Sequence, residues 1–129
     1  HTKMKNMEIE LASFIIPKEL LEYFEITDIR EHETARKEIR LFIRLTEKNT
    51  VPVESAGRRV ESKGFYPEME VQDFPLRGRP VFLLVRRRRW RDQETGEEIM
   101  RDWNLISEGT KYTREFADFL KEVARFRAG

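Results

Sequence analysis

Alternation of apolar and polar positions is clearest between Glu38 and Glu47. Every second residue there is apolar, and the apolar set is Ile39, Leu41, Ile43 and Leu45. A period of two predicts a β-strand with one buried face. A weaker alternation runs from Glu25 to Glu33 and places Ile26 and Ile29 on opposite faces. Because residues 32–37 have turn character, the range 25–47 is predicted to form an antiparallel hairpin.

Helical spacing occupies the two ends of the chain. Met7, Leu11, Phe14 and Ile15 predict a packed helix, and Pro17 separates it from a second short helix over 18–24, so residues 1–24 form the N-terminal helices. At the other end, Thr113 is a favourable N-cap. The i, i+3, i+4, i+7 pattern that follows it predicts an amphipathic helix over 113–127, with an apolar face made of Phe116, Phe119, Leu120 and Val123.

The middle of the chain, Asp73 to Trp103, is predicted to form a hairpin. A turn at 76–80 precedes the apolar run Val81–Val85, and four arginines and Trp90-Arg91 follow. Turn residues at 92–97 then lead into a second extended run at 98–103. Upstream, residues 58–65 are predicted to form a short strand.

These elements indicate an α+β fold in a single domain, residues 1–129, which is long enough for one core. We expect N-terminal helices at 1–24, a hairpin at 25–47, a metal-free, ribbon-like β region at 58–103 and a C-terminal helix at 113–127. The strands would make an antiparallel sheet of about four to six strands around the central hairpin. No apolar run approaches the length of a membrane helix, and there is no cysteine, so a cytoplasmic protein without disulfides is expected.

Charge is distributed unevenly although the net charge is only +1. Residues 1–57 hold 9 basic and 11 acidic residues, which gives −2. Residues 58–91 hold 10 basic and 4 acidic residues, a net charge of +6. Residues 92–129 hold 6 basic and 9 acidic residues, a net charge of −3. Residues 77–91 alone contain seven arginines and no acid. A basic middle between mildly acidic ends is typical of a surface that meets a polyanion.

Catalytic motifs are missing from the sequence. There is no glycine-rich phosphate loop, dinucleotide fingerprint or nucleophile elbow. His32 stands in a predicted turn without another internal histidine or a cysteine, which is typical of a solvated surface residue. We therefore expect no enzymatic activity, no cofactor and no metal site.

The arginine run has two interpretations. On one continuous strand, Arg86, Arg88 and Trp90 would share one face, and Arg87, Arg89 and Arg91 the other. Cross-strand pairing with acids such as Glu97, Glu98 and Asp102 would neutralise one set. The other set, joined by Arg77 and Arg79, would then make bidentate contacts to phosphates, with Trp90 packing or stacking on bases. The second interpretation is a surface strand whose arginines form cross-strand salt bridges.

The string from Asp73 to Val81, running into Arg86–Arg91, resembles a block in the N-terminal regions of bacterial insertion-sequence transposases of the ISL type. The similarity is closer to the split-off N-terminal proteins of ISAon-type transposases, where residues 61–67 and 101–103 also match. The resemblance covers about residues 58–123. In the ISL pattern cysteines follow the arginine-aromatic string, but residues 92–97 replace them here, so no structural zinc is expected.

The resemblance implies a non-catalytic chain that binds DNA at transposon terminal repeats, because the family's catalytic acids lie in a later domain. The residues expected to contact DNA are Lys63, Arg77, Arg79, Arg86, Arg87, Arg88, Arg89, Trp90 and Arg91. The alternative is a protein-interaction module whose arginines pair internally. That module would dock a separate transposase catalytic subunit through Phe116, Phe119 and Val123.

Overall fold

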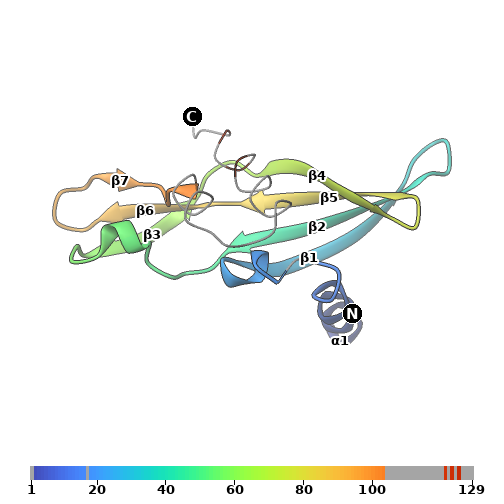
Figure 1. Ribbon diagram of the computed structural model, residues 1–129, viewed down its shortest axis with the longest axis horizontal. Helices are drawn as coiled ribbons and strands as arrows, with labels where there is room; N and C mark the ends of the chain where they lie inside the picture. Colours follow the sequence, from blue (N-terminus) through green and yellow to red (C-terminus); the bar gives the residue numbers. More distant parts are fainter. Residues whose placement is uncertain (1, 17, 104–120, 122, 124, 126–129) are drawn as a thin grey trace. The chain divides into compact units, whose positions relative to one another are not determined.

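The computed structural model describes residues 2–16 and 18–103, together with Lys121, Val123 and Arg125 (Figure 1). The chain divides into two compact units, residues 1–47 with 68–86 and residues 48–67 with 87–129, called unit 1 and unit 2 below. Helix and strand are both present, so the predicted α+β class is confirmed. Most of the predicted C-terminal helix, 113–127, lies outside the described residues.

Unit 1 contains a four-stranded sheet with the order β1-β2-β5-β4 (Figure 1). Its strands are β1 (Phe24–Glu33), β2 (Ile39–Glu47), β4 (Met69–Leu76) and β5 (Arg79–Arg86). The β1–β2 and β4–β5 pairs are antiparallel hairpins, and β2 runs parallel to β5. The hairpin predicted at 25–47 is therefore confirmed. The prediction of a single, wholly antiparallel sheet is wrong, because the long connection through unit 2 lets β5 return parallel to β2.

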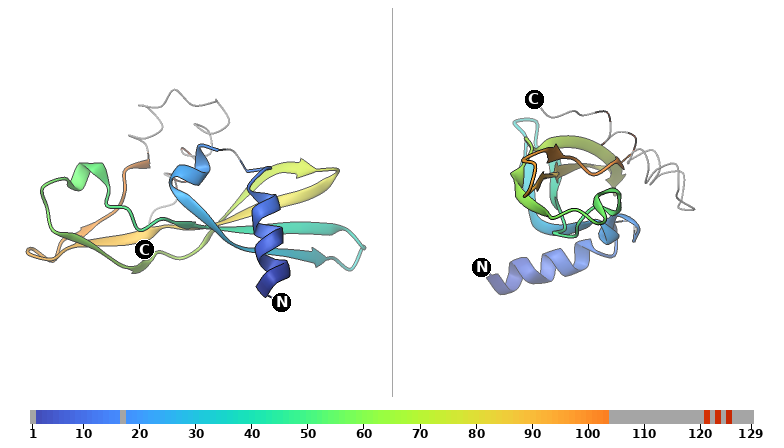
Figure 2. Two further views of the ribbon diagram at one scale, coloured as in Figure 1. Left: turned by 90° about the horizontal axis from the view of Figure 1, so that it is seen from below. Right: turned by 90° about the vertical axis from the view of Figure 1, so that its left-hand side faces the viewer.

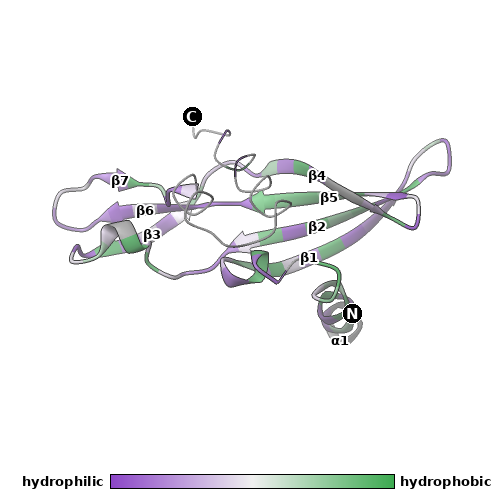
Figure 3. Ribbon diagram, in the orientation of Figure 1, coloured by the Kyte–Doolittle hydropathy of each residue, from purple (hydrophilic) through white to green (hydrophobic). Residues whose placement is uncertain are grey.

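The core of unit 1 lies on one face of the β2–β5 pair. Ile43 is opposite Leu83, and Leu45 is opposite Val85. All four side chains are at most 1% exposed. Figure 3 shows apolar colouring along much of β5, as the run Val81–Val85 predicted. The predicted inward face of β2 is confirmed by these contacts.

A bulge changes the face of β1 halfway along the strand. The register between β1 and β2 shifts between Ile26 and Asp28. Ile26 lies opposite Leu45 and Ile29 lies opposite Ile43, so both isoleucines are on the core face. The predicted placement of Ile26 and Ile29 on opposite faces is wrong, because the extra residue moves the following side chains to the other face.

The N-terminal segment packs by different residues from those predicted. Helix α1 (Thr2–Ala12) lies beside β1 (Figure 2), and a single 3-10 turn, η1 (Leu20–Glu22), replaces the predicted second helix. Ala12 and Ile16 are buried. The helix ends at Ala12, so the expected spacing does not continue to Phe14 and Ile15. The apolar stripe expected to pack is instead exposed, with Met7 at 58%, Leu11 at 65%, Phe14 at 81% and Ile15 at 44%.

Unit 2 contains a three-stranded antiparallel sheet with the order β3-β6-β7. Its strands are β3 (Val60–Phe65), β6 (Arg88–Asp92) and β7 (Glu98–Ile99), and a 3-10 turn, η2 (Val53–Ser55), precedes them. The strand predicted at 58–65 and the turn at 92–97 are confirmed. Trp90, Trp103 and Val123 are buried in this unit. None of the helices that the structure describes is both long and apolar enough to span a membrane.

Candidate nucleic-acid interface

The tip of the β4–β5 hairpin carries two exposed arginines. Leu76 pairs with Arg79, so Arg77 and Gly78 form a two-residue turn. Both have positive φ, 52° and 78°, which is the geometry of a type I′ turn and matches the right-handed twist of the strands. The turn predicted at 76–80 is therefore confirmed. Among the described residues, neither Arg77 nor Arg79 forms an ion pair.

A second basic turn lies at the same end of unit 1. In the β1–β2 turn, the Lys37 N–H donates to the Thr34 carbonyl, and the Glu38 N–H donates to Thr34 Oγ1 at 3.2 Å. These bonds hold Lys37 at φ 63° and leave Arg36 and Lys37 exposed. Leu41 lies opposite Val81 in the parallel pair, so the starts of β2 and β5 are level and both turns share one end (Figure 1). We call Arg36, Lys37, Arg77 and Arg79 the cationic end.

The arginine run does not lie on one strand. Arg86 ends β5 in unit 1, Arg87 falls between strands, and Arg88 begins β6 in unit 2. The prediction of one continuous strand through the run is therefore wrong, and the grouping of Arg86 with Arg88 and Trp90 on one face stays a prediction. Strict alternation requires a continuous strand, and here the chain changes sheet within the run.

Three of these arginines lie over aromatic rings of unit 2, and the Arg89 guanidinium is 5.8 Å from the Tyr66 ring centroid. The Arg88 guanidinium is 4.8 Å from the Phe65 ring centroid, and Arg88 Nη1 donates to Ser62 Oγ at 2.9 Å. The Arg87 guanidinium is 5.5 Å from the Tyr66 ring, and Arg87 is only 2% exposed. Burial also raises the pKa of the Tyr66 hydroxyl. Cation–π contacts of this kind stabilise the fold and occupy the arginine.

The other predicted contact residues of unit 2 differ in accessibility. Arg89 donates from Nε and Nη2 to Glu98 Oε1 at 2.8 and 2.6 Å, which is one of the cross-strand pairs expected. Lys63 Nζ lies 3.3 Å from Glu61 Oε1. Trp90 has no exposed surface, so its place in the structure is that of a packing residue. Arg91 is exposed and forms no ion pair with any described residue.

A buried arginine that the sequence did not single out joins the two tryptophans. The Arg101 guanidinium is 6.0 Å from the Trp90 ring and 5.7 Å from the Trp103 ring. Arg101 also donates to the Thr50 carbonyl, and it is 6% exposed. The sequence does place Arg101 two positions before Trp103, in the extended run predicted at 98–103. A count of charges alone does not distinguish such a buried arginine from an exposed one.

Asp92 organises the turn that stands where the ISL pattern has cysteines. Its Oδ1 accepts from the backbone N–H groups of Glu94 at 2.8 Å and Thr95 at 3.1 Å, and its Oδ2 accepts from Arg58 Nε at 2.7 Å. The Thr95 N–H and then Arg58 lower the pKa of this carboxyl group below its ordinary value. Within the described part of the chain, no group of three or more potential ligands is placed to hold a metal ion. The turn is closed by hydrogen bonds.

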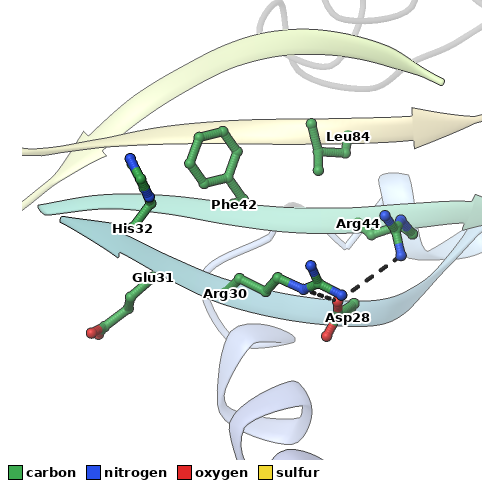
Figure 4. Close-up of a pocket in the computed structure, with 7 residues that line it drawn as sticks. All are labelled: Asp28, Arg30, Glu31, His32, Phe42, Arg44 and Leu84. Carbon is green, nitrogen blue, oxygen red and sulfur yellow. Dashed lines mark hydrogen bonds and ion pairs between the residues drawn. The ribbon is translucent and has the colours of Figure 1, made fainter. Parts of the chain in front are cut away.

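The face of the unit 1 sheet opposite the core carries a second candidate surface. Its centre is a stacked pair, Phe42 and Phe82, with ring centroids 5.2 Å apart and planes at 19°. Beside the pair is an open hollow of about 560 Å³ (Figure 4). The residues that line the hollow are Asp28, Arg30, Glu31, His32, Phe42, Arg44 and Leu84. The alternation at 38–47 placed Phe42 on the outward face, but its aromatic partner on β5 could not be known without the parallel register.

The comparisons with protein families, with curated proteins and with solved structures find no match to this chain. The interface is therefore assigned from the chain's own residues.

Proposed function

We propose that this chain is a non-catalytic DNA-binding region of an insertion-sequence transposase. In this proposal the cationic end of unit 1 contacts phosphates, with Arg91 of unit 2 as a further contact. Lys63 and Arg87–Arg89 act mainly within unit 2, through Glu61, Tyr66, Phe65 and Glu98. The resemblance of residues 58–123 to transposase N-terminal regions supports transposon terminal repeats as the DNA.

The observation that carries the proposal is the exposure of Arg77 and Arg79 without carboxylate partners among the described residues. A guanidinium group donates to phosphate oxygens in a planar, bidentate geometry that a lysine cannot reproduce. Arg36 and Lys37 add two further charges at the same end. In this proposal the four residues together contact the backbone of a nucleic acid.

The test is fluorescence anisotropy with a labelled duplex that contains the element's terminal repeat. Five phosphate contacts, four from the cationic end and one from Arg91, predict that log K falls against log salt with a slope of about −4.5. The affinity would then drop roughly 500-fold between 50 and 200 mM salt. A duplex of scrambled sequence separates recognition of the repeat from general affinity. No binding at 50 mM salt, or binding that salt does not weaken, contradicts the proposal.

A second candidate function is favoured by the exposed apolar stripe of the N-terminal segment. Met7, Leu11 and Phe14 lie within eight consecutive positions and are each more than half exposed. Exposed apolar patches mark interaction sites. In this alternative the chain docks the separate catalytic subunit. Phe116 and Phe119 of the predicted C-terminal helix 113–127 would contribute, whereas Val123 has no exposed surface and belongs to the core.

Co-purification with that subunit after nuclease treatment tests this second candidate. The double substitution Leu11→Glu with Phe14→Glu should abolish docking and leave the melting temperature unchanged, because both side chains are exposed. Retained docking in that variant would assign the contact to other residues.

A further inference from the structure

The hollow on the open face of unit 1 has an aromatic floor formed by Phe42, which is stacked on Phe82. Phe42, Phe82 and Leu84 are half-buried, and Figure 4 shows the Phe42 ring face on, between β2 and β5. The Arg40 guanidinium is 6.0 Å from the Phe82 centroid, so a cation also lies against the stacked pair. A flat, partly exposed aromatic surface beside an arginine favours planar, unsaturated ligands.

Charged groups along one side of the hollow are linked by ion pairs. Arg30 Nε lies 2.7 Å from Asp28 Oδ2, and Arg44 Nη1 lies 3.9 Å from the same oxygen. Arg44 Nε also donates to Glu68 Oε2 at 2.7 Å. The bulge at Thr27 makes these ion pairs possible, because it places Asp28 opposite Arg44 on the open face. Figure 4 shows Arg30, Asp28 and Arg44 as a connected row beside Phe42.

This row offers donors and acceptors together. Arg30 and Arg44 carry donors, while the Asp28 carboxylate between them carries acceptors. A phosphate group would need donors alone. The edge of a nucleobase presents both donors and acceptors beside a flat π face, which matches the row and the aromatic floor.

We propose that the hollow binds one unpaired nucleobase of a single-stranded or distorted nucleic acid. The base stacks on Phe42, and its polar edge meets the row formed by Arg30, Asp28 and Arg44. This inference rests on the proposed function, and it adds a preference for unpaired bases. A base within a duplex is stacked on both sides and cannot present its face. From Phe82 the backbone reaches the cationic end at Arg79 within about 10 Å along β5.

The test compares a single strand with a duplex of the same sequence, by anisotropy, in the full chain. Phe42→Leu keeps an apolar side chain of similar size and removes the ring. It should weaken single-strand binding by about 5- to 150-fold and leave duplex binding unchanged. Phe42→Tyr keeps the ring and should retain single-strand binding. A 2-aminopurine in the strand should change its fluorescence on binding to the wild type and to Phe42→Tyr, but not to Phe42→Leu.

Arg30→Gln provides a second variant, since the Arg30 side chain is 71% exposed and its replacement leaves the core untouched. It should alter the preference among the four bases and leave duplex affinity within about twofold. If duplex binds and Phe42→Leu affects single strand and duplex equally, or neither, the nucleobase site is wrong and the proposed function stands. If neither nucleic acid binds, the proposed function fails and the nucleobase site fails with it.

Discussion

Leu41 lies opposite Val81 across a parallel pair of strands. Each residue stands two positions after the start of its strand, so the two strands begin level with each other. The turns that precede them therefore come to the same end of the sheet. One register thus gathers Arg36 and Lys37 with Arg77 and Arg79, which are about forty positions apart in the sequence.

The integrity of the cationic end depends on the core beneath this pair of strands. Leu83 is 1% exposed and lies opposite Ile43. Leu83→Ala should lower the free energy of unfolding by about 2–5 kcal/mol, because it removes buried methyl groups and leaves a cavity. Urea denaturation measures the change. Leu76→Ala, at a 41% exposed position on the same hairpin, is the control and should change stability far less.

Arg89 should contribute to the fold of unit 2 more than to DNA affinity. Its two donors meet Glu98 Oε1 across the β6–β7 pair, and both side chains are about half exposed. Arg89→Gln should lower the melting temperature by less than about 3 °C, as expected for a surface pair. The same substitution should leave duplex affinity within about twofold. A tenfold or larger loss of affinity would show that Arg89 leaves Glu98 to bind phosphate.

Asp92 should make the stability of unit 2 sensitive to acid. The fold lowers the pKa of this carboxyl group, so its contribution is present above the ordinary value of 3.8 and is lost as the pH falls below that value. At pH 7, the Asp92→Asn variant should have a lower melting temperature than the wild type. The two melting curves should converge as the pH falls below 3.8.

Glu94→Gln is the matched control for the acid titration, since Glu94 lies in the same turn with an exposed side chain. The melting temperature of Glu94→Gln should equal that of the wild type at every pH. A constant difference between the wild type and Asp92→Asn down to pH 2 would mean that the charge on Asp92 does not stabilise the turn.

Local patterns in the sequence predicted the elements whose determinants are local. The period of two at 38–47, the Arg77-Gly78 turn and the turn at 92–97 each depend on neighbouring residues, and each is found. The N-terminal helix was found as well, but its buried face was not, because it ends at Ala12 instead of continuing through Phe14.

Features that depend on distant partners were not predictable in the same way. The parallel pairing of β2 with β5 requires the chain to pass through unit 2 between these strands. No pattern among neighbouring residues predicts this pairing. The Phe42–Phe82 stack follows from that register. The arginine run was treated as one strand because Val81–Trp90 shows no turn residue, yet the chain changes sheet at Arg87. Composition could locate the positive charge but not decide which arginines meet an aromatic ring or an acid.

The most direct measurement is the salt dependence of duplex binding for Arg77→Asn combined with Arg79→Gln. Asparagine tolerates the positive φ of position 77, so the turn is kept while both charges are removed. Arg59→Gln removes an exposed arginine of unit 2 as the control. We predict that the slope of log K against log salt becomes less steep by about 2 in the double variant and stays unchanged in the control. A double variant with the wild-type slope and affinity would contradict the assignment of the cationic end as the DNA contact.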